Sequence, residues 1–420
     1  MMKLLWNEDV LIRKFPTLNE NIETDVLVIG GGICGILCAY RLHKLGKKVI
    51  VVEAGRIGKK KTLRTTAVAT CLQDVFYKDL EYQKAKLFFE ANSFAIREYK
   101  SLAEDFNFDL EVVSSHKYSD NIEELELEKK CIFDIGGNVS IIKKDINNKK
   151  YNCLMMEEQI QFHPLKLINE LSKSLEIYEN TKIIKLKNNI AYTNMNMIKA
   201  KDIIVTTNYP FMKWQGLFFT KLYQMKSYVI ACENNNYYPF NAIGSKLGDL
   251  YYRTYKDLLI IGGNDNNLGC EKSGFNSLIT STNDKIIYKW INQDSMSLDK
   301  LPYIGKIKKN LYVATGFNMW GMTGSMISSV LISDLIRNNN NSWELLFSPK
   351  RHIKMNVRLD FFKHTLKELV KVRKNKCSHL GCGLVWNDES KSYECPCHGS
   401  RFDELGGNLE GPALEDSQIK

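Results

Sequence analysis

The sequence DVLVIGGGICGILCAYRLHKLGKKVIVVE, residues 25–53, sets the architecture of the N-terminal half of this chain. It opens with an apolar, β-branched run at residues 25–29, which is typical of a parallel strand buried on both faces. A glycine cluster follows at once, and residues 36–45 then have the composition of a helix. Residues 48–52 predict the next strand, and Glu53 stands at its end. Binding of a dinucleotide requires this order of strand, glycine turn, helix, strand and acid.

The glycine cluster GGGICG at residues 30–35 fits the pattern G-x-G-x-x-G. Gly30 permits a tight turn, Gly32 lets the backbone approach a pyrophosphate, and Gly35 lets the helix pack closely on the sheet. The N-terminus of the helix faces the phosphates, and Glu53 would accept hydrogen bonds from ribose hydroxyls. The motif favours a dinucleotide site over a purely structural glycine turn, but it does not distinguish FAD from NAD.

A second glycine-rich segment late in the chain favours FAD. Residues 311–324, LYVATGFNMWGMTG, again run from a predicted strand into a glycine, Gly316, and a helix over residues 323–337 begins nearby. The N-terminus of such a helix would stabilise negative charge that develops at a flavin ring. We therefore expect FAD as the cofactor, with Gly316 among the residues that bind it.

The composition is that of a large globular chain. It has 420 residues, of which 44% are apolar and 25% charged, and this length corresponds to roughly two to three domains. Disordered and collagen-like chains are excluded. Lys and Arg outnumber Asp and Glu by 58 to 48, but the basic residues are scattered rather than gathered in one motif. We therefore expect a solvated surface and no nucleic-acid partner.

The sequence predicts neither a targeting segment nor a membrane span. Glu8, Asp9, Arg13 and Lys14 stand where a secretory signal would need an apolar stretch. Residues 310–333 lack charged side chains and are long enough to cross a bilayer, but polar residues and glycines interrupt them. The expectation is a cytoplasmic protein with no transmembrane span.

The two glycine-rich segments, together with YYRTYKDLLIIGGNDNN at residues 251–267, resemble the D-amino-acid oxidase superfamily of FAD enzymes. The resemblance implies an α/β fold, in which a Rossmann-like FAD-binding domain carries an inserted antiparallel-sheet substrate domain. It also implies a FAD-dependent oxidoreductase unit over residues 1–355, with a FAD part at about 20–75, 150–210 and 300–345 and a substrate part at about 76–149 and 211–299.

The same resemblance suggests residues near the flavin and the substrate. Thr65 and Thr66 are carried over as flavin contacts, although three lysines at residues 59–61 replace small residues of the family pattern. Arg253, in a predicted strand, is our candidate for binding a substrate carboxylate in a bidentate fork, with a surface charge as the alternative. Trp320 is a candidate for the substrate pocket, with ordinary packing as the alternative.

Cysteine and histidine are concentrated near the C-terminus, where a second site is predicted. Cys377 and His379 form a C-x-H pair, and Cys395 and His398 form a C-x-x-H pair. Two loops that each supply one cysteine and one histidine suit a Rieske centre, in which two thiolates hold one iron of a 2Fe-2S cluster and two imidazoles hold the other. Structural zinc is the alternative, but zinc loops usually pair like ligands.

The segments CSHLGCGLVWND and YECPCHGSRFD resemble the Rieske domains of the cytochrome bc family. This implies a small all-β domain, shorter than its relatives, over residues 356–420, with cluster ligands Cys377, His379, Cys395 and His398 and a disulfide between Cys382 and Cys397. Ser400 matches a hydroxyl that donates to the sulfurs in high-potential relatives, whereas Phe402 replaces a tyrosine donor. We therefore predict a reduction potential below that of the respiratory relatives. Residues 361–372 read as a helix or a single strand.

Together the two sites predict a dehydrogenase. A C–N bond of an amine or amino acid would be oxidised at FAD, and the cluster would pass the electrons to an outside acceptor. An oxygen-using oxidase and a non-catalytic electron-transfer protein are the alternatives. A Rieske monooxygenase is disfavoured, because too few histidines remain to hold a mononuclear iron.

Overall fold

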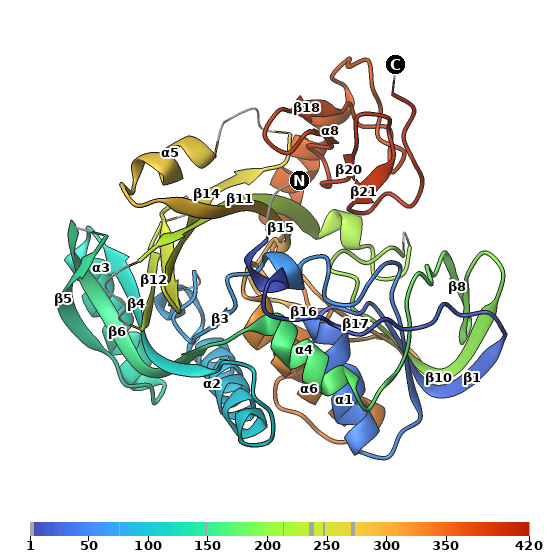
Figure 1. The fold of residues 1–420 in the computed structure, drawn as a ribbon, viewed down its shortest axis with the longest axis horizontal. Coiled ribbons are helices and arrows are strands. Elements are labelled where there is room, and N and C mark those ends of the chain that lie inside the picture. Colours follow the sequence, from blue (N-terminus) through green and yellow to red (C-terminus); the bar gives the residue numbers. More distant parts are fainter. Residues whose placement is uncertain are drawn as a thin grey trace.

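Figure 1 shows the arrangement of the chain in a computed structural model. The structure describes residues 4–419 except residues 75, 148, 213, 235–238, 247 and 270–273. A mainly parallel sheet lies on one side of the molecule and a larger mixed sheet on the other, and a small C-terminal domain sits above them in this view. The predicted α/β class with an added all-β domain is confirmed.

The first sheet has eight strands in the order β16-β17-β10-β1-β2-β7, with β9 beside β10 and β8 beside β9. Neighbours from β17 to β7 pair in parallel, whereas β16 pairs antiparallel with β17. All residues of β2 and β17 are buried, as expected for strands covered on both faces. The strands are β1 (Ile22–Ile29), β2 (Val49–Val52), β7 (Glu176–Tyr178), β8 (Lys185–Lys187), β9 (Ile190–Tyr192), β10 (Met197–Val205), β16 (Tyr303–Lys308) and β17 (Leu311–Thr315).

Two helices follow the glycine turns of this sheet. Helix α1 (Ile33–Lys44) comes directly after β1, and α6 (Gly321–Ile336) comes after β17 and packs against α1. Helix α4 (Pro164–Ser172) also packs on α1, and the side chain of His163 caps it by accepting from the Lys166 N–H. Among the residues the structure describes, no helix is both long and apolar enough to cross a membrane.

The second sheet has nine strands, in the order β15-β11-β14-β13-β12-β4-β6-β3 with β5 beside β6. It is antiparallel, as expected, except that β12 and β4 run parallel. The strands are β3 (Val68–Ala69), β4 (Glu111–Ser119), β5 (Ser140–Ile146), β6 (Lys149–Gln161), β11 (Leu222–Glu233), β12 (Phe240–Gly244), β13 (Tyr251–Tyr255), β14 (Leu258–Asn267) and β15 (Ile286–Ser297). Because β6 pairs with β4 and β5, residues 150–161 lie with this sheet, whereas the sequence assigns them to the FAD part.

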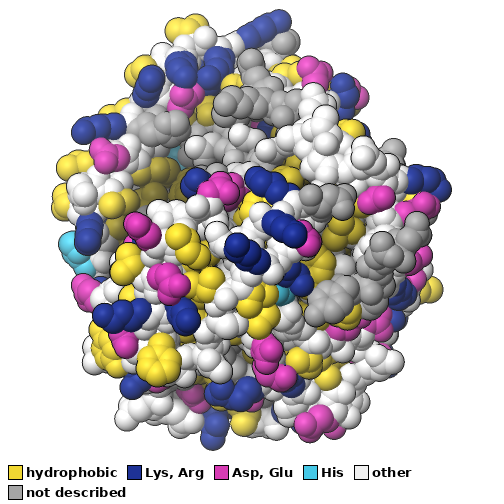
Figure 2. Space-filling model, turned by 90° about the vertical axis from the view of Figure 1, so that its left-hand side faces the viewer, with side chains coloured by type: hydrophobic (Ala, Val, Ile, Leu, Met, Phe, Trp, Pro, Cys, Tyr) yellow, Lys and Arg dark blue, Asp and Glu magenta, His cyan; other side chains and the backbone are white. Residues whose placement is uncertain are grey.

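The remaining helices differ in length and pack on both sheets and on one another. They are α2 (Tyr82–Asp105), α3 (Ile122–Asp134), α5 (Phe275–Thr280) and α7 (Glu344–Phe347), with single 3-10 turns η1 (Leu5–Asn7), η2 (Thr62–Arg64), η3 (Tyr77–Asp79) and η4 (Phe218–Thr220). On the face shown in Figure 2, basic and acidic side chains are intermixed, as expected for a solvated surface.

The C-terminal domain begins with a helix and continues as a four-stranded antiparallel sheet. The helix, α8 (Met355–Leu369), covers most of the stretch that the sequence left open between a helix and a strand. The strands are β18 (Val385–Asn387), β19 (Ser392–Glu394), β20 (Arg401–Phe402) and β21 (Asn408–Glu410). In Figure 1 this domain lies over β11 and β14 of the second sheet.

Candidate active site and metal centre

The glycine turn after β1 opens onto a groove at the carboxyl edge of the first sheet. Gly30 has a φ of +117°, and a Cβ atom on it would lie 2.9 Å from the Thr206 carbonyl oxygen. A Cβ atom on Gly35 would lie 1.9 Å from the Gly30 carbonyl oxygen, so α1 can approach this closely only with glycine there. In front of Gly32, the nearest atom to such a Cβ is the Thr62 hydroxyl oxygen at 3.5 Å. The turn therefore presents open backbone of the kind that a pyrophosphate requires.

The groove has an empty volume of about 1320 Å³, and Gly30, Gly32 and Glu53 line it. The Glu53 carboxylate accepts hydrogen bonds from the N–H groups of Gly31 at 2.8 Å and Gly55 at 2.9 Å, which fix it at the end of β2. An open glycine turn, a helix N-terminus and an anchored carboxylate together fit the dinucleotide part of FAD. The ribose contact of Glu53 stays a prediction.

An anchored loop, residues 64–67, leads from the groove to the second sheet. Its four consecutive carbonyl oxygens accept hydrogen bonds from three buried side chains that are distant in sequence. Trp290 and Trp6 donate through their indole N–H groups, at 2.8 and 2.7 Å, and the Arg253 guanidinium donates to the last two carbonyls. The path of this loop is therefore set by contacts from segments that lie both before and after it in the sequence.

Arg253, in β13, has a role that the sequence did not suggest. Its guanidinium is buried and donates to the carbonyl oxygens of Thr66, Ala67 and Phe162, the last two at 2.9 and 3.0 Å. Backbone carbonyls thus accept hydrogen bonds from both terminal nitrogens, while the side chain also lines the pocket described below. Arg253 therefore anchors the loop, since buried carbonyl groups outside a sheet need a donor, and binding of a substrate carboxylate by this side chain stays a prediction.

A pocket with an empty volume of about 850 Å³ lies between the anchored loop, the second sheet and the start of α6. Thr65 and Thr66 line it, as does Trp320, whose indole N–H donates to the Asp74 carboxylate at 2.9 Å. Gly316, with a φ of +68°, belongs to the turn after β17 and is not among the residues that line this pocket. Arg253 lines the pocket as well, so the geometry gathers four of the expected flavin and substrate residues around one cavity.

Carboxylates line the side of this pocket formed by the second sheet. Burial raises the pKa of Asp265 to about 7 and that of Asp294 to about 6, and it also raises the pKa of Asp74. These groups act on the neighbouring phenol of Tyr251, whose pKa lies well above its ordinary value, mainly because of burial. The side-chain nitrogen of Asn241 is buried in the lining and meets no hydrogen-bond partner among the described residues. The pocket therefore suits a polar ligand that offers an amino group to the carboxylates and an oxygen acceptor to the Asn241 side-chain N–H.

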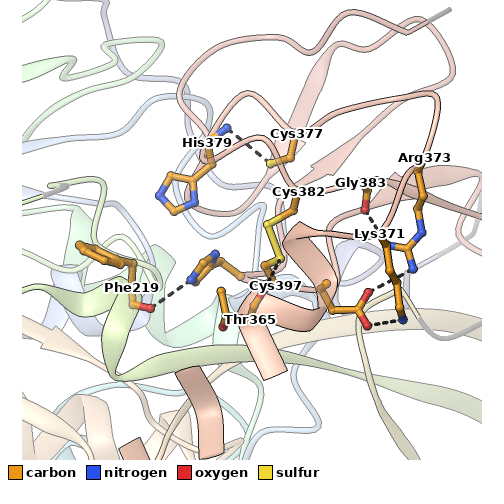
Figure 3. Close-up of a disulfide and its surroundings, with 11 residues drawn as sticks. Phe219, Thr365, Lys371, Arg373, Cys377, His379, Cys382, Gly383 and Cys397 are labelled. Atoms are coloured by element: carbon orange, nitrogen blue, oxygen red, sulfur yellow. Dashed lines mark hydrogen bonds and ion pairs between the residues drawn. A yellow bond between two sulfur atoms is a disulfide. The ribbon is translucent and has the colours of Figure 1, made fainter. Parts of the chain in front are cut away.

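The four expected cluster ligands meet between two loops of the C-terminal domain, and residues of both loops are labelled in Figure 3. Cys377 and His379 precede β18, whereas Cys395 and His398 lie in the turn between β19 and β20. All four are buried, with an exposed fraction of 8% for His379 and at most 3% for the others. The two imidazole rings are 5.2 Å apart, and the two thiols lie within hydrogen-bonding reach. Two thiols and two imidazoles are the donor set of a Rieske cluster.

Several donors surround the Cys377 sulfur. The Cys395 thiol contributes most to lowering the pKa of Cys377 to about 7, and the His379 N–H and the Ser400 hydroxyl lower it further. Such donors favour the thiolate, which is the form that binds iron. Ser400 thus stands at the sulfur, as the sequence predicts, while Phe402 is fully buried and brings no hydroxyl.

A disulfide joins Cys382 to Cys397, as the resemblance implied, and ties the two ligand loops together (Figure 3). The two sulfurs and a ring nitrogen of His398 lie within 4.8 Å of one another. Because both sulfurs are committed to the disulfide, this group does not offer thiolate ligands and acts as a clamp beside the ligand loop. Helix α8 packs underneath, where the Cys397 sulfur lies 4.0 Å from the Thr365 carbonyl oxygen.

One ring nitrogen of His398 faces the rest of the protein. Its Nε2 lies 3.1 Å from the carbonyl oxygen of Phe219 in η4 (Figure 3). Its Nδ1 is buried and meets no hydrogen-bond partner in the described part of the chain, which is the state expected of the nitrogen that binds a metal. Next to it, the Gly399 carbonyl accepts from the Gln293 side chain at 2.7 Å. The cluster loop therefore packs directly on the FAD-binding and substrate unit.

A buried ion pair holds the two units together. Lys226 of β11 and Glu394 of β19 have side chains that are 2% and 0% exposed, and Nζ lies 3.1 and 2.9 Å from the two carboxylate oxygens. The Gly269 N–H also donates to this carboxylate at 2.9 Å. A carboxylate and an ammonium this deeply buried require one another, so docking of the C-terminal domain is part of the fold.

The groove, the pocket and the thiol–imidazole centre define a flavin-dependent oxidoreductase with an iron–sulfur site. Residues 25–335 match the sequence model of the FAD dependent oxidoreductase family, called DAO, and the chain belongs to this family. Residues 352–419 match the Rieske [2Fe-2S] domain. The cofactors are therefore FAD and a Rieske-type 2Fe-2S cluster, which the residues described above would hold.

Known proteins with similar sequences also point to an iron–sulfur domain. The Bacillus subtilis (strain 168) protein YhfW, named as a Rieske 2Fe-2S iron-sulfur protein, is 29% identical, and the match covers 98% of this chain and 96% of YhfW. The cytochrome b6-f complex iron-sulfur subunit 2 of Trichormus variabilis (strain ATCC 29413 / PCC 7937) is 51% identical over 39 residues, which are 9% of this chain and 22% of that subunit.

Solved structures of similar fold cover more than three quarters of this chain. Glycine oxidase from Geobacillus kaustophilus matches with a TM-score of 0.68 and 16% identity, over 79% of this chain and 99% of that one. L-proline dehydrogenase from P. horikoshii matches with a TM-score of 0.66 and 16% identity, over 78% and 97%. At this identity the likeness establishes the fold.

Sequence reasoning missed the contacts that join distant segments. Trp6 and Trp290 carry no motif, and their role depends on carbonyl groups of a loop far away in the chain. The local sequence around Lys226 and around Glu394 predicts an ordinary exposed charge at each position. A weak signal existed for Lys226, since it lies within a predominantly apolar run of a strand.

Proposed function

We propose that this protein oxidises a C–N bond of an amine or amino acid and passes the electrons through its 2Fe-2S cluster to an external acceptor. The substrate loses a hydride from carbon and a proton from nitrogen as its C–N bond becomes C=N. FAD, when bound, supplies the hydride acceptor, and the cluster carries single electrons onward. One observation carries the proposal: the pocket and the cluster loops lie on opposite faces of the same two strands.

Strands β11 and β15 form this shared wall. Side chains alternate between the two faces of a strand, and Ser227, Asn292 and Asp294 line the pocket. The neighbouring residues Lys226 and Gln293 point the other way and bind the C-terminal domain. A single layer of backbone therefore separates the pocket from the loop that carries His398, which supports a short electron path between the two centres.

The lining of the pocket supports a substrate with an amino group. Asp74, Asp265 and Asp294 face the cavity, whereas the Arg253 guanidinium is occupied by backbone carbonyls. An ammonium group pairs with such carboxylates, and the neutral amine that donates a hydride is favoured when a buried acid accepts its proton. The names of the similar structures, glycine oxidase and L-proline dehydrogenase, point to the same class of substrate.

The acceptor is proposed to approach near His379. Of the four expected ligands, His379 has the largest exposed fraction, while the ring of His398 is covered by Phe219 and Phe361. Electrons would then enter on the covered side and leave on the side nearer to solvent. A cytoplasmic location is part of this proposal, because the cysteines outside the C-terminal loops are free thiols in the described structure.

The test is an anaerobic reaction of the purified protein, containing both cofactors, with a panel of amines and amino acids. We expect loss of flavin absorbance followed by the electron paramagnetic resonance signal of a reduced Rieske cluster. A Gln293→Leu variant should slow the second phase and leave the first unchanged. An oxidase would instead keep its flavin reduced and its cluster oxidised until oxygen is admitted. A non-catalytic electron carrier would show no flavin reduction with any amine, and either result refutes the proposal.

A further inference from the structure

The dinucleotide groove is not built from the FAD-binding unit alone. All residues of the segment 408–414 except Pro412 line the groove together with Gly30, Gly32 and Glu53, and this segment comprises β21 and the turn after it. This closing segment, residues 408–414, belongs to the C-terminal domain and lies far from the glycine turn in sequence. One wall of the FAD site is therefore supplied by the iron–sulfur domain.

Three lysines attach the closing segment to the FAD-binding unit. Lys60 donates to the Leu409 carbonyl at 3.3 Å, and Lys61 forms an ion pair with Glu410 at 2.8 Å. Across the groove, Lys182 donates to a third backbone position of the same segment, the Leu414 carbonyl, at 2.8 Å. Contacts from both sides of the groove thus hold the closing segment in place across the groove.

The pair of Lys61 and Glu410 is the strongest of these contacts. The two side chains are 18% and 17% exposed, and Arg401 lies 3.7 Å from the same carboxylate. Burial lowers the pKa of Lys61 to about 8, while Lys61 and Arg401 hold the pKa of Glu410 below its ordinary value despite burial. A pair this shielded is weakly screened by salt and binds its partners more firmly than a surface pair does.

This contact also explains a departure of the sequence from the family pattern. The lysines at residues 59–61 replace small residues, and the loop that carries them runs beside the glycine turn. Lys60 and Lys61 both reach the closing segment. Their presence is expected in a chain whose groove is covered by a second domain, and not in one whose groove is open.

We propose that the closing segment is a latch over the dinucleotide groove, so that FAD enters and leaves only when residues 408–414 move away from Lys60, Lys61 and Lys182. The iron–sulfur domain would then retain the flavin as well as accept its electrons. A latch controls passage in both directions, whereas a residue that merely contacts FAD changes its release alone.

The experiment measures FAD release and rebinding in the full-length protein with its cluster in place. Flavin fluorescence reports both rates in Lys61→Met and Glu410→Gln, and visible circular dichroism checks that the cluster is intact. We expect both release and rebinding to become at least threefold faster in each variant. The matched control is Lys199→Met, which removes an exposed ion pair with Glu23 on the first sheet and should leave both rates at wild-type values.

Two results would overturn the latch. Rates within threefold of wild type in variants with an intact cluster would show that the segment does not gate the groove. Faster release with unchanged rebinding would show instead that these side chains contact FAD directly. If Lys61→Met does not fold, Glu410→Gln decides the matter, because Gln keeps the shape of the side chain and removes its charge.

Discussion

Replacing Lys226 by methionine should loosen the C-terminal domain from the rest of the protein. The change leaves the Glu394 carboxylate fully buried, with the Gly269 N–H and the Ser390 hydroxyl still donating to it at 2.9 and 3.0 Å. Breaking a buried pair by removing one partner costs roughly 3–5 kcal/mol. Because two hydrogen-bond donors to Glu394 remain, we expect the free energy of unfolding to fall by the lower end of this range, about 3 kcal/mol.

Urea unfolding with two optical signals measures this cost. At a slope of about 2 kcal/mol per molar urea, a loss of about 3 kcal/mol moves the midpoint down by roughly 1.5 M. The visible circular dichroism of the cluster should show this shift, because the lost contact lies at the docking surface, and the flavin signal should move less. In a double variant, Lys226→Met with Glu394→Leu, much of the stability should return, since an apolar pair needs no compensating charge.

The matched control is Lys285→Met, which breaks a pair with Glu233 whose side chains are 72% and 49% exposed. Exposed pairs contribute about 0–1 kcal/mol, so its midpoint should stay close to that of the wild type. If Lys226→Met unfolds at the same urea concentration as this control, the buried pair does not hold the domains together.

Three further predictions concern single residues of the two sites. Arg253→Met leaves the carbonyls of the anchored loop without their donor. At about 1–3 kcal/mol for each buried unsatisfied group, the free energy of unfolding should fall by roughly 3 kcal/mol. A higher KM with unchanged thermal stability would instead support the substrate-binding role. Phe402→Tyr should raise the reduction potential of the cluster by adding a donor near the sulfurs, and a redox titration showing no rise would count against the missing-donor argument. Burial raises the pKa of Asp265 to about 7, above its ordinary 3.8, so the folded state holds this proton more tightly and stability should fall as the pH rises from about 4 to 7. Asp265→Asn should make this decline of the thermal midpoint shallower, and identical pH profiles would contradict the assignment.

Features encoded within one short segment were predictable from the sequence. The glycine turn was predicted from the spacing of Gly30, Gly32 and Gly35, which lie within one short segment. The metal centre was predicted in the same way from the two cysteine–histidine pairs. The disulfide followed from family resemblance, which transfers a long-range contact without deriving it. Glu53 was placed correctly at the end of its strand because strand and acid adjoin.

Features that depend on distant partners were not predictable. Arg253 could have served a substrate or the backbone, and only the fold shows that the carbonyls of residues 66, 67 and 162 surround it. The boundary at residue 150 was set too early, because a strand's sheet depends on its neighbours and not on its own composition. Docking of the C-terminal domain could not be predicted, because Lys226 and Glu394 are far apart in the sequence and only the fold brings them together.

The shared wall of β11 and β15 makes the register of these strands a condition for both sites at once. In β11, Ser227 points into the pocket and Lys226 toward the C-terminal domain. Inserting or deleting one residue would exchange the two faces, sending the lysine into the acidic pocket and leaving the Glu394 carboxylate without its cation. The strand therefore tolerates changes of side chain far better than changes of length, and variation in length among related proteins is expected in the surrounding loops.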